Sequence, residues 1–206
     1  SSHRRQRQMC IRDRFPDGHE LCLEMPGMHG NYTATTSIQK SDLLIAIGVR
    51  FDDRVTANPS FFAQNAKVIH ADIDPAEIGK VREAQVPIVG DAKSVILGLV
   101  NALGDTKLNT ENWINELNSM KTEFPLSYNQ NENGPLKVPF VLEELQNLTE
   151  EDAIVVSGVG QHQMWISQHW NFTEPNTWLN SGGLGTMGYS LPCLLYTSDA
   201  ADDANC

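Results

Sequence analysis

The sequence predicts an α/β fold with open, mostly parallel sheets and helices on both faces. Three short apolar runs are typical of buried parallel strands: Leu43–Ile47, Lys67–Asp72 and Val86–Val89. Segments in which apolar residues recur at helical spacing lie between and after these runs. This alternation of strand and helix indicates an open parallel sheet covered by helices.

The first half of the chain supplies the helices expected around these strands. A short helix is predicted over Pro75–Arg82, because proline is favoured at the first helical position. A longer helix is predicted over Ser94–Leu103, with Asp91 as its N-cap and Gly104 as its C-terminal stop. A further helix is predicted over Glu111–Phe124.

A second α/β unit is predicted after a polar linker. Residues 126–137 carry Asn, Gly and Pro, which is typical of a connection between domains. The linker is followed by a predicted helix at Pro139–Leu148, a strand at Ala153–Ser157, a helix at Gln161–His169 and a strand at Thr177–Asn180. Two strands are too few to close a core, so we expect parts of two domains.

Composition excludes several classes of protein. The 206 residues are 40% hydrophobic and 20% charged, which rules out wholesale disorder. The net charge of −11 argues against a nucleic-acid partner, and no apolar run is long enough for a membrane span. The cysteines Cys10, Cys22, Cys193 and Cys206 have neither metal-ligand spacing nor a disulfide pattern.

The two ends of the chain do not read as native protein. Arg4–Asp13 and Cys193–Asp202 can be encoded by one DNA element in opposite orientations, and that element resembles the transposase adapter used to make sequencing libraries. We therefore interpret residues 1–14 and 193–206 as adapter translation. The alternative is a real basic arm and a real acidic tail.

Charged residues and glycines follow all three strands of the first unit. Gly48 allows close approach of a phosphate, and Arg50 and Arg54 can pair with it. Asp72 is placed to bind a ribose, whereas Asp74 is interpreted as an N-cap. Gly90–Asp91 repeats the pattern, so we expect a nucleotide across this sheet edge. A surface salt-bridge cluster is the alternative at Gly48–Arg54.

Three further segments carry binding chemistry. Pro26–Gly30 is a glycine-flanked loop with one histidine, His29, for which a simple turn is the alternative. Gly158–Met164 opens a helix after a strand and predicts an anion site, and a hydrogen-bonded core histidine is the alternative for His162. Gly182–Gly188 has the glycine density of a backbone pressed against a flat ligand, and a flexible loop is the alternative.

The sequence shows no arrangement typical of a nucleophile or a metal centre, although its segments predict nucleotide and anion binding. This combination is expected of an enzyme whose cofactor carries the chemistry.

Six ordered motifs resemble those of one enzyme family. The strings PGMHG, IAIGVRFDDRVT, HADIDPAEIGK, VPIVGDA, GVGQHQMW and SGGLGTMGYSLP are similar to those of the catalytic subunits of acetohydroxyacid synthases (acetolactate synthases), which depend on thiamine diphosphate. The resemblance covers nearly all of Gly27–Pro192 and is weakest over Asn109–Pro139. It implies that residues 15–125 are the later part of a central FAD-binding domain and that residues 138–192 begin a diphosphate-binding domain.

The resemblance also implies the site residues. The predicted FAD contacts are His29, Gly48, Val49, Arg50, Asp52, Arg54, Asp72, Ile73, Gly90, Asp91, Gln163 and Met164. The predicted thiamine diphosphate contacts are Val159, Gly160, Gln161, His162, Gly185 and Met187. No metal ligand is predicted, because the family's Mg²⁺ motif is expected beyond Pro192. The activating glutamate is expected in a preceding domain, so we expect no turnover by this chain alone.

The implied reaction condenses pyruvate with a second 2-oxo acid and releases CO₂. The implied parent is a homodimer or homotetramer, with a regulatory subunit possible and neither nucleic acid nor membrane as a partner. The compartment follows from the source: cytoplasmic in a bacterium, plastid or mitochondrial in a eukaryote. Alternatives are another FAD-containing carboligase, such as glyoxylate carboligase, or a non-catalytic nucleotide-binding module.

Overall fold

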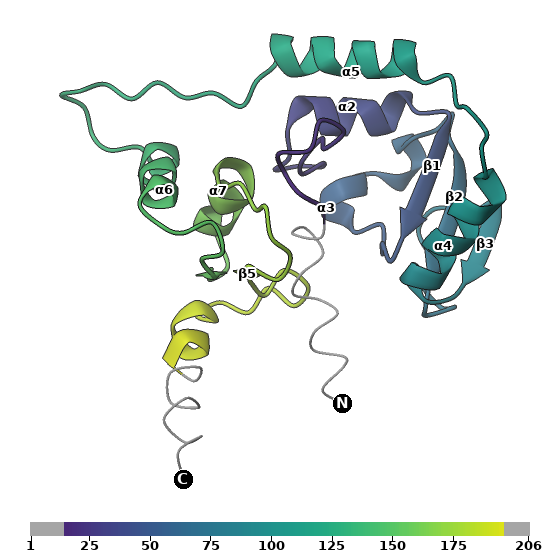
Figure 1. The fold of residues 1–206 in the computed structure, drawn as a ribbon. Coiled ribbons are helices and arrows are strands. Elements are labelled where there is room, and N and C mark those ends of the chain that lie inside the picture. Colours follow the sequence, from purple (N-terminus) through teal and green to yellow (C-terminus); the bar gives the residue numbers. More distant parts are fainter. Residues whose placement is uncertain (1–14, 196–206) are drawn as a thin grey trace. The chain divides into compact units, whose positions relative to one another are not determined.

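The computed structural model describes residues 15–195, which form two compact units. Pro26–Pro125 make the three-stranded unit, and the residues on either side of that range make the two-stranded unit. Residues 1–14 and 196–206, most of the predicted adapter translation, lie outside the described residues. The predicted α/β class is confirmed, because both units contain parallel strands and helices (Figure 1).

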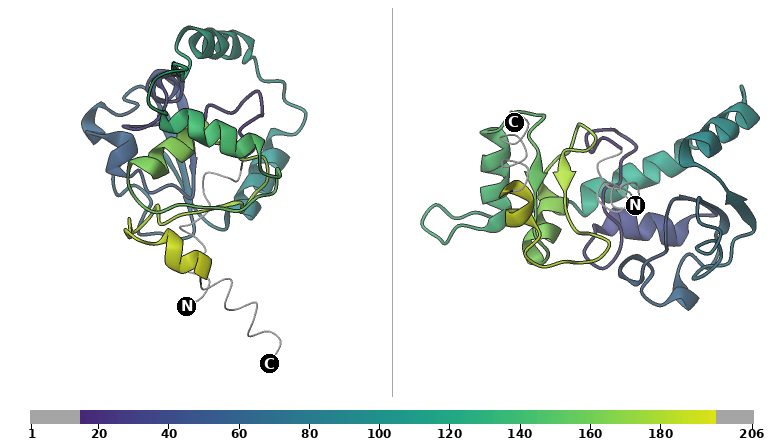
Figure 2. Two further views of the ribbon diagram at one scale, coloured as in Figure 1. Left: turned by 90° about the vertical axis from the view of Figure 1, so that its left-hand side faces the viewer. Right: turned by 90° about the horizontal axis from the view of Figure 1, so that it is seen from below.

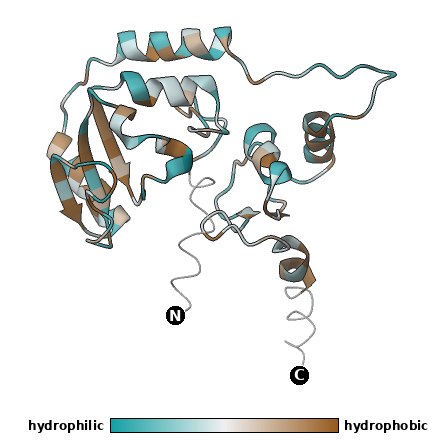
Figure 3. Ribbon diagram, turned by 180° about the vertical axis from the view of Figure 1, so that it is seen from behind, coloured by the Kyte–Doolittle hydropathy of each residue, from teal (hydrophilic) through white to brown (hydrophobic). Residues whose placement is uncertain are grey.

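The three-stranded unit contains the strands predicted from the apolar runs, with the predicted bounds. β1 (Leu43–Ile47), β2 (Lys67–Asp72) and β3 (Val86–Val89) lie in that order and are parallel. Ile45 lies opposite Ile69, which lies opposite Val86. Figure 3 shows that these strands carry mostly hydrophobic residues. The prediction that all three are buried holds for the central strand β2, whereas β1 buries only Ala46 and β3 has no buried residue, because both lie at the edges of the three-stranded sheet.

The two long helices after this sheet form close to where the sequence predicts them. α4 (Ala92–Leu103) begins two residues early, and the side chain of Asp91 accepts the amides of Lys93 and Ser94 as the predicted N-cap. Gly104, with a φ of 51°, ends the helix as predicted. α5 (Glu111–Glu123) lies alongside α2 (Tyr32–Lys40), as Figure 2 shows.

Helix α2 and the two short helices α3 (Asp53–Thr56) and η2 (Pro59–Phe61) were not predicted. The sequence of α2 is rich in threonine, a weak helix former, so its pattern is not typical of a helix. Its N-cap Asn31, whose side chain accepts the amide of Ala34 at 2.7 Å, stabilises its first turn.

The predicted helix over Pro75–Arg82 is wrong, because this segment forms turns. The amide of Glu77 donates to the carbonyl of Asp74 at 3.1 Å, a turn bond that does not continue as a helical ladder. Gly79 then adopts a φ of 73°, which is incompatible with an α-helix, and its amide donates to Nδ1 of buried His70. A tertiary contact therefore overrides the local signal of the proline.

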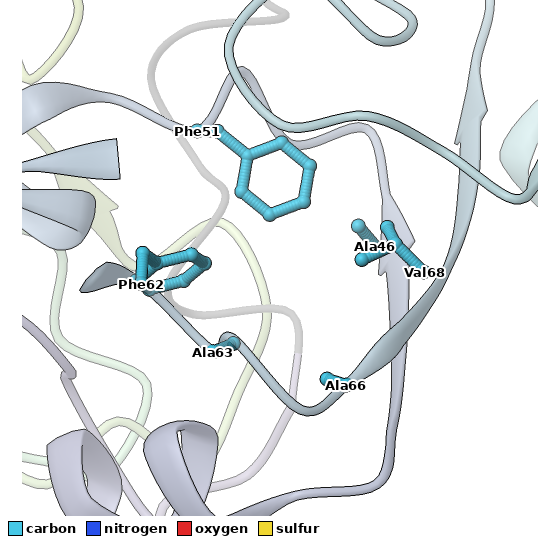
Figure 4. Close-up of a cluster of buried hydrophobic side chains, with 6 residues drawn as sticks. All are labelled: Ala46, Phe51, Phe62, Ala63, Ala66 and Val68. Atoms are coloured by element: carbon cyan, nitrogen blue, oxygen red, sulfur yellow. The ribbon is translucent and has the colours of Figure 1, made fainter. Parts of the chain in front are cut away.

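The core of this unit lies between the sheet and the segment after β1. The buried residues shown in Figure 4 are Ala46, Phe51, Phe62, Ala63, Ala66 and Val68. Phe51 packs edge-on against His70, with ring centroids 5.0 Å apart, and His70 Nε2 lies 2.8 Å from the carbonyl oxygen of Val49. Phe51 has a φ of 53°, so tertiary packing holds a backbone conformation that is costly for a bulky residue. This packing fixes the loop that leaves β1.

The two-stranded unit has the predicted element order, with shorter strands. It contains α6 (Val138–Asn147), β4 (Val155–Val156), α7 (Gln161–His169) and β5 (Trp178–Leu179). Helix α7 has the predicted bounds, whereas β4 and β5 pair over only two residues each. The buried hydrophobic residues of this unit cluster together and are Ile166, Trp170, Phe172 and Trp178.

Residues 15–25 belong with the two-stranded unit. The Asp17 carboxylate accepts the amide of Phe172 at 2.9 Å. The hydroxyl of buried Ser167 on α7 donates to Met25 Sδ at 3.2 Å. These bonds attach the segment before Pro26 to residues 142 and 155 positions later in the chain. Within the described range of 15–195, no helix is both long and apolar enough to cross a membrane.

Candidate cofactor-binding sites

The carboxyl ends of β1, β2 and β3 meet at one edge of the sheet, here called the β1–β3 edge. The amide of Gly48 donates to the carbonyl of Ala71 at 2.8 Å, and the amide of Gly90 donates to the carbonyl of Asp72 at 3.0 Å. These two bonds continue the ladder past the strand ends. The predicted FAD residues Gly48, Asp72 and Gly90 are therefore brought together, although they are up to 42 positions apart in the sequence.

The charged residues after β1 form a local network at this edge. Arg50 Nη2 lies 2.8 Å from Asp52 Oδ2, and the amide of Arg54 donates to Asp52 Oδ1 at 3.0 Å. The Arg54 amide lowers the pKa of the Asp52 carboxyl, and the Arg50 and Arg54 charges act in the same direction. Asp52 is also the N-cap of α3, so it fixes the backbone of Arg54 and, through its other oxygen, orients the side chain of Arg50. Arg54 Nε lies 3.9 Å from Asp53 Oδ1, and the Arg54 side chain is mostly exposed.

The loop that carries His29 lies against the same segment. The amide of Met28 donates to the carbonyl of Arg54 at 2.8 Å. Gly27 has a φ of 98°, and a Cβ there would lie 2.5 Å from the carbonyl oxygen of Arg54, so only glycine fits. The structure thus brings the two predicted FAD segments around His29 and Arg50 into contact through their backbones.

Asp72 ends β2 and Asp91 precedes α4. Each accepts backbone amides with only one of its carboxylate oxygens among the described residues. Asp72 Oδ1 accepts the amide of Asp74 at 2.8 Å, and Asp91 Oδ1 accepts the amides of Lys93 and Ser94. Asp74 accepts the amide of Ala76 in a turn, because no helix follows for it to cap. The other carboxylate oxygens of Asp72 and Asp91 suit hydroxyl donors such as those of ribose.

The β1–β3 edge fits a dinucleotide in its chemistry. Gly48 has a φ of 66° and open space where a Cβ would be, so the backbone is accessible to a ligand. Cationic Arg50 suits phosphate, and Asp72 and Asp91 suit ribose. Ile73 and Val89 expose apolar surface beside them, which suits a flat ring.

The ends of β4 and β5 form a second edge, here called the β4–β5 edge. The amide of Ser157 donates to the carbonyl of Leu179 at 2.9 Å, which continues the parallel pairing by one residue. Directly after these strand ends come the Gly158–Gly160 turn into α7 and the loop Ser181–Gly188. The two segments predicted to bind thiamine diphosphate therefore leave the same edge of one sheet.

Glycines let the His162 ring fold against the turn before α7. A Cβ on Gly158 would lie 2.9 Å from His162 Nε2, and a Cβ on Gly160 would lie 3.3 Å from His162 Cε1. Gly160 has a φ of 147° and gives α7 no side-chain cap. The Gln163 amide donates to the carbonyl of Gly160 at 3.1 Å, so the amides of Gln161 and His162 are the ones left to an outside acceptor, and their side chains are exposed. This arrangement fits a diphosphate.

The glycine-rich loop after β5 is a hydrogen-bonded turn. The amide of Gly185 donates to the carbonyl of Ser181 at 2.8 Å, and the amide of Thr186 donates to Ser181 Oγ at 3.1 Å. Gly185 has a φ of 65° and open space at its Cβ position, so its backbone can approach a flat ligand. Met187 is 80% exposed, so its apolar side chain is accessible from solvent.

Gln163 and Met164 lie in the two-stranded unit, whereas the other predicted FAD residues lie in the three-stranded unit. Within its own unit, Gln163 Nε2 donates to Asn180 Oδ1 at 3.0 Å. Val159 is half-buried in the turn before α7. Among residues 15–195, no three His, Cys, Asp or Glu side chains gather as a metal site would require.

Sequence reasoning missed two buried polar residues at the β4–β5 edge. Trp178 Nε1 donates to Ser157 Oγ at 3.0 Å, and Asn180 pairs with Gln163. The two missed residues are Ser157 and Asn180. Each is a polar residue directly after a short apolar run, and this position at a strand end was the available signal.

Two family models match the chain. The thiamine pyrophosphate enzyme central domain matches residues 8–99, and the C-terminal thiamine-pyrophosphate-binding domain matches residues 158–197. The first match contains the β1–β3 edge, and the second contains the start of α7 and the glycine-rich loop.

Whole-sequence comparison finds enzymes of one kind. The chain is 51% identical over 192 residues to the acetolactate synthase large subunit of Corynebacterium glutamicum, covering 92% of this chain and 31% of that protein. It is 50% identical to an acetolactate synthase of Mycobacterium leprae, covering 95% of this chain and 32% of that protein. It is 45% identical to the chloroplastic acetolactate synthase of Arabidopsis thaliana, covering 92% of this chain and 29% of that protein.

The fold, the two edges and the domain matches define a member of the thiamine-pyrophosphate-dependent enzymes. Within that class the chain belongs to the acetolactate synthase family, to which it is about 50% identical over most of its length. This confirms the family predicted from the six motifs. The chain spans about a third of the length of these relatives.

Proposed function

We propose that this chain is the cofactor-binding part of an enzyme that condenses two 2-oxo acids. The substrates are two pyruvates, or pyruvate and 2-oxobutyrate. The products are CO₂ and either 2-acetolactate or 2-aceto-2-hydroxybutyrate. Both condensations are reactions of branched-chain amino-acid biosynthesis. The observation that carries the proposal is the β4–β5 edge, where an uncapped helix start and a glycine-rich turn leave one sheet edge together.

Thiamine diphosphate is the cofactor that this edge fits. When bound, it supplies the nucleophilic carbon and the electron sink needed to decarboxylate a 2-oxo acid. The amides and side chains of Gln161 and His162, at the uncapped start of α7, would hold its diphosphate. The accessible backbone at Gly185 would contact its aminopyrimidine, and the exposed Met187 would pack against the cofactor as an apolar wedge.

FAD is proposed as a second cofactor, at the β1–β3 edge. Arg50 pairs with its phosphates while Asp52 orients that guanidinium, and Asp72 and Asp91 accept ribose hydroxyls. The condensation has no net redox change, so FAD acts here by binding and by ordering its domain. Mg²⁺ is proposed as the third cofactor, held by residues outside those described. The proposed assembly is a homodimer or homotetramer, with a possible regulatory subunit.

A chimaeric enzyme tests the proposed reaction. Residues 27–192 replace the matching segment of the Corynebacterium glutamicum large subunit, and acetolactate formation from pyruvate is measured. We expect activity in the chimaera and its loss when His162→Ala is added, whereas Lys67→Ala, at the amino end of β2, leaves it unchanged. An inactive but folded chimaera that retains its cofactors contradicts the proposal. A chimaera that consumes glyoxylate in place of pyruvate assigns the segment to another carboligase.

A further inference from the structure

Asn180 links two segments of the β4–β5 edge. It follows β5 directly and is only 7% exposed. Its Oδ1 accepts a 3.0 Å hydrogen bond from Nε2 of Gln163, which lies in the first turn of α7. A buried amide oxygen with this partner ties the strand end to the start of the helix.

The same oxygen also lies against the glycine-rich loop. A Cβ on Gly182 would be 2.8 Å from Asn180 Oδ1, closer than real Cβ contacts allow. Gly182 does not have a positive φ, so its backbone conformation would accept alanine. The Asn180 side chain is therefore what excludes a side chain at Gly182. Ser181, between Asn180 and Gly182, accepts hydrogen bonds from the amides of Gly185 and Thr186, so the rest of the loop is tied to the same segment.

We propose that Asn180 is a positioning residue that holds the first turn of α7 and the loop Gly182–Gly188 in one fixed arrangement. The two segments are those assigned above to the diphosphate and the aminopyrimidine of thiamine diphosphate, so the functional part of this inference rests on the proposed function. Asn180 sets the spacing of the two segments through its contacts with Gln163 in the helix and Gly182 in the loop. The coupling itself is a property of the protein without ligand.

Amide hydrogen exchange of the 206-residue chain, read by mass spectrometry, tests the coupling. Asn180→Ala removes the acceptor and the contact with Gly182, and we expect exchange about two- to tenfold faster in both 161–164 and 182–188, the range for one lost hydrogen bond. Thr177→Val is the matched control. It removes one buried side-chain bond, to the carbonyl of Glu174, at the other end of β5 and leaves both segments unchanged.

Two further variants separate positioning from general destabilisation. Asn180→Asp keeps an acceptor oxygen for Gln163, so we expect it to restore slow exchange in the first turn of α7. In the double variant Gln163→Ala/Asn180→Ala, we expect the amides of 161–164 to exchange no faster than in Asn180→Ala alone, because both substitutions remove the same hydrogen bond. Additive effects of the two single changes contradict a shared bond.

Gly182→Ala gives a second-site test. In the wild-type background its Cβ displaces Asn180, so exchange rises in both segments. In the Asn180→Ala background the obstacle is gone, and Gly182→Ala adds nothing. A harmless Gly182→Ala in the wild-type background, or unchanged exchange in Asn180→Ala, overturns the proposal.

Titration of the chimaera described above with thiamine diphosphate and Mg²⁺ by calorimetry connects the coupling to function, because the chimaera contains the rest of the site. We expect Asn180→Ala in the chimaera to bind about tenfold more weakly, with Thr177→Val unchanged. Equal affinity of the unchanged chimaera and its Asn180→Ala variant overturns the functional part. If the unchanged chimaera binds nothing while exchange of the chain responds as described, the assignment of the cofactor fails and the positioning role of Asn180 stands.

Discussion

The indole nitrogen of Trp178 donates a 3.0 Å hydrogen bond to the hydroxyl of Ser157, and both side chains are buried. Trp178 belongs to β5 and Ser157 follows β4, so this bond supplements a backbone pairing of only two residues from each strand. The Trp178 ring also stacks on Phe172, with centroids 5.3 Å apart. The β4–β5 edge is therefore stabilised by side chains as much as by the sheet.

Ser157→Ala is expected to destabilise the two-stranded unit by about 1–3 kcal/mol, because it removes the hydroxyl that accepts the hydrogen bond of the buried indole N–H. Urea unfolding followed by tryptophan fluorescence measures the loss. Ser167→Ala is the matched control, since Ser167 is equally buried but is the donor in its bonds to Met164 and Met25. Its removal leaves only acceptors, and we expect a loss below about 1 kcal/mol. Equal losses in both variants would contradict the role given to Ser157.

Gly158→Ala is expected to displace His162 and weaken binding of inorganic pyrophosphate by about tenfold, or 1.4 kcal/mol. The physical reason is the 2.9 Å approach of a Cβ to His162 Nε2. Calorimetric titration measures the affinity. Gly98→Ala, inside α4 with open space around it, is the control and should stabilise its helix by about 0.5–1 kcal/mol. Unchanged pyrophosphate affinity in Gly158→Ala would show that the His162 ring position is unimportant.

Arg50→Ala is expected to weaken FAD binding by about tenfold or more, the range for a lost hydrogen bond to a charged group. Equilibrium dialysis against FAD gives the dissociation constant. The control is Lys67→Ala, which also removes one positive charge but at the amino end of β2. We expect the FAD affinity of this variant to stay within about twofold of wild type, because salt screens distant charges. A similar loss in both variants would indicate general electrostatics in place of a site.

Asp52 predicts an acid-dependent contribution to stability. Its pKa is lowered in the folded chain, so the contribution is complete above the unfolded pKa of about 4 and is lost as the pH falls through the folded value. Asp52→Asn keeps the N-cap and removes only the charge, so we expect a loss below about 1 kcal/mol at pH 7. Urea unfolding followed by circular dichroism at pH 7 and pH 2.5 should show this difference shrinking in acid.

Asp52→Ala separates the cap from the charge. It removes the acceptor for the Arg54 amide as well, and we expect about 1 kcal/mol of further loss at both pH values. A difference between wild type and Asp52→Asn that grows in acid would contradict the cause assigned to the lowered pKa.

The strands of the three-stranded unit could be predicted because each is a contiguous apolar run, and α4 because Asp91 and Gly104 mark its ends. The segment Pro75–Arg82 could not, because the position of Gly79 depends on His70, a residue of another element. The loop residues of both edges could be predicted because they directly follow strands. Ser157 and Asn180 also follow strands, but their buried hydrogen bonds could not be predicted, because the partners lie 17 to 21 positions away in the sequence.

The parallel pairing of β4 with β5 also determines when the β4–β5 edge can exist. Parallel neighbours cannot be joined by a tight turn, so the chain must pass through the whole of α7 before Trp178 can reach Val155. A nascent chain that has emerged from the ribosome only as far as α7 has a helix start but no edge. Assembly of this site is therefore a late, non-local step in folding, slower than formation of the helices that surround it.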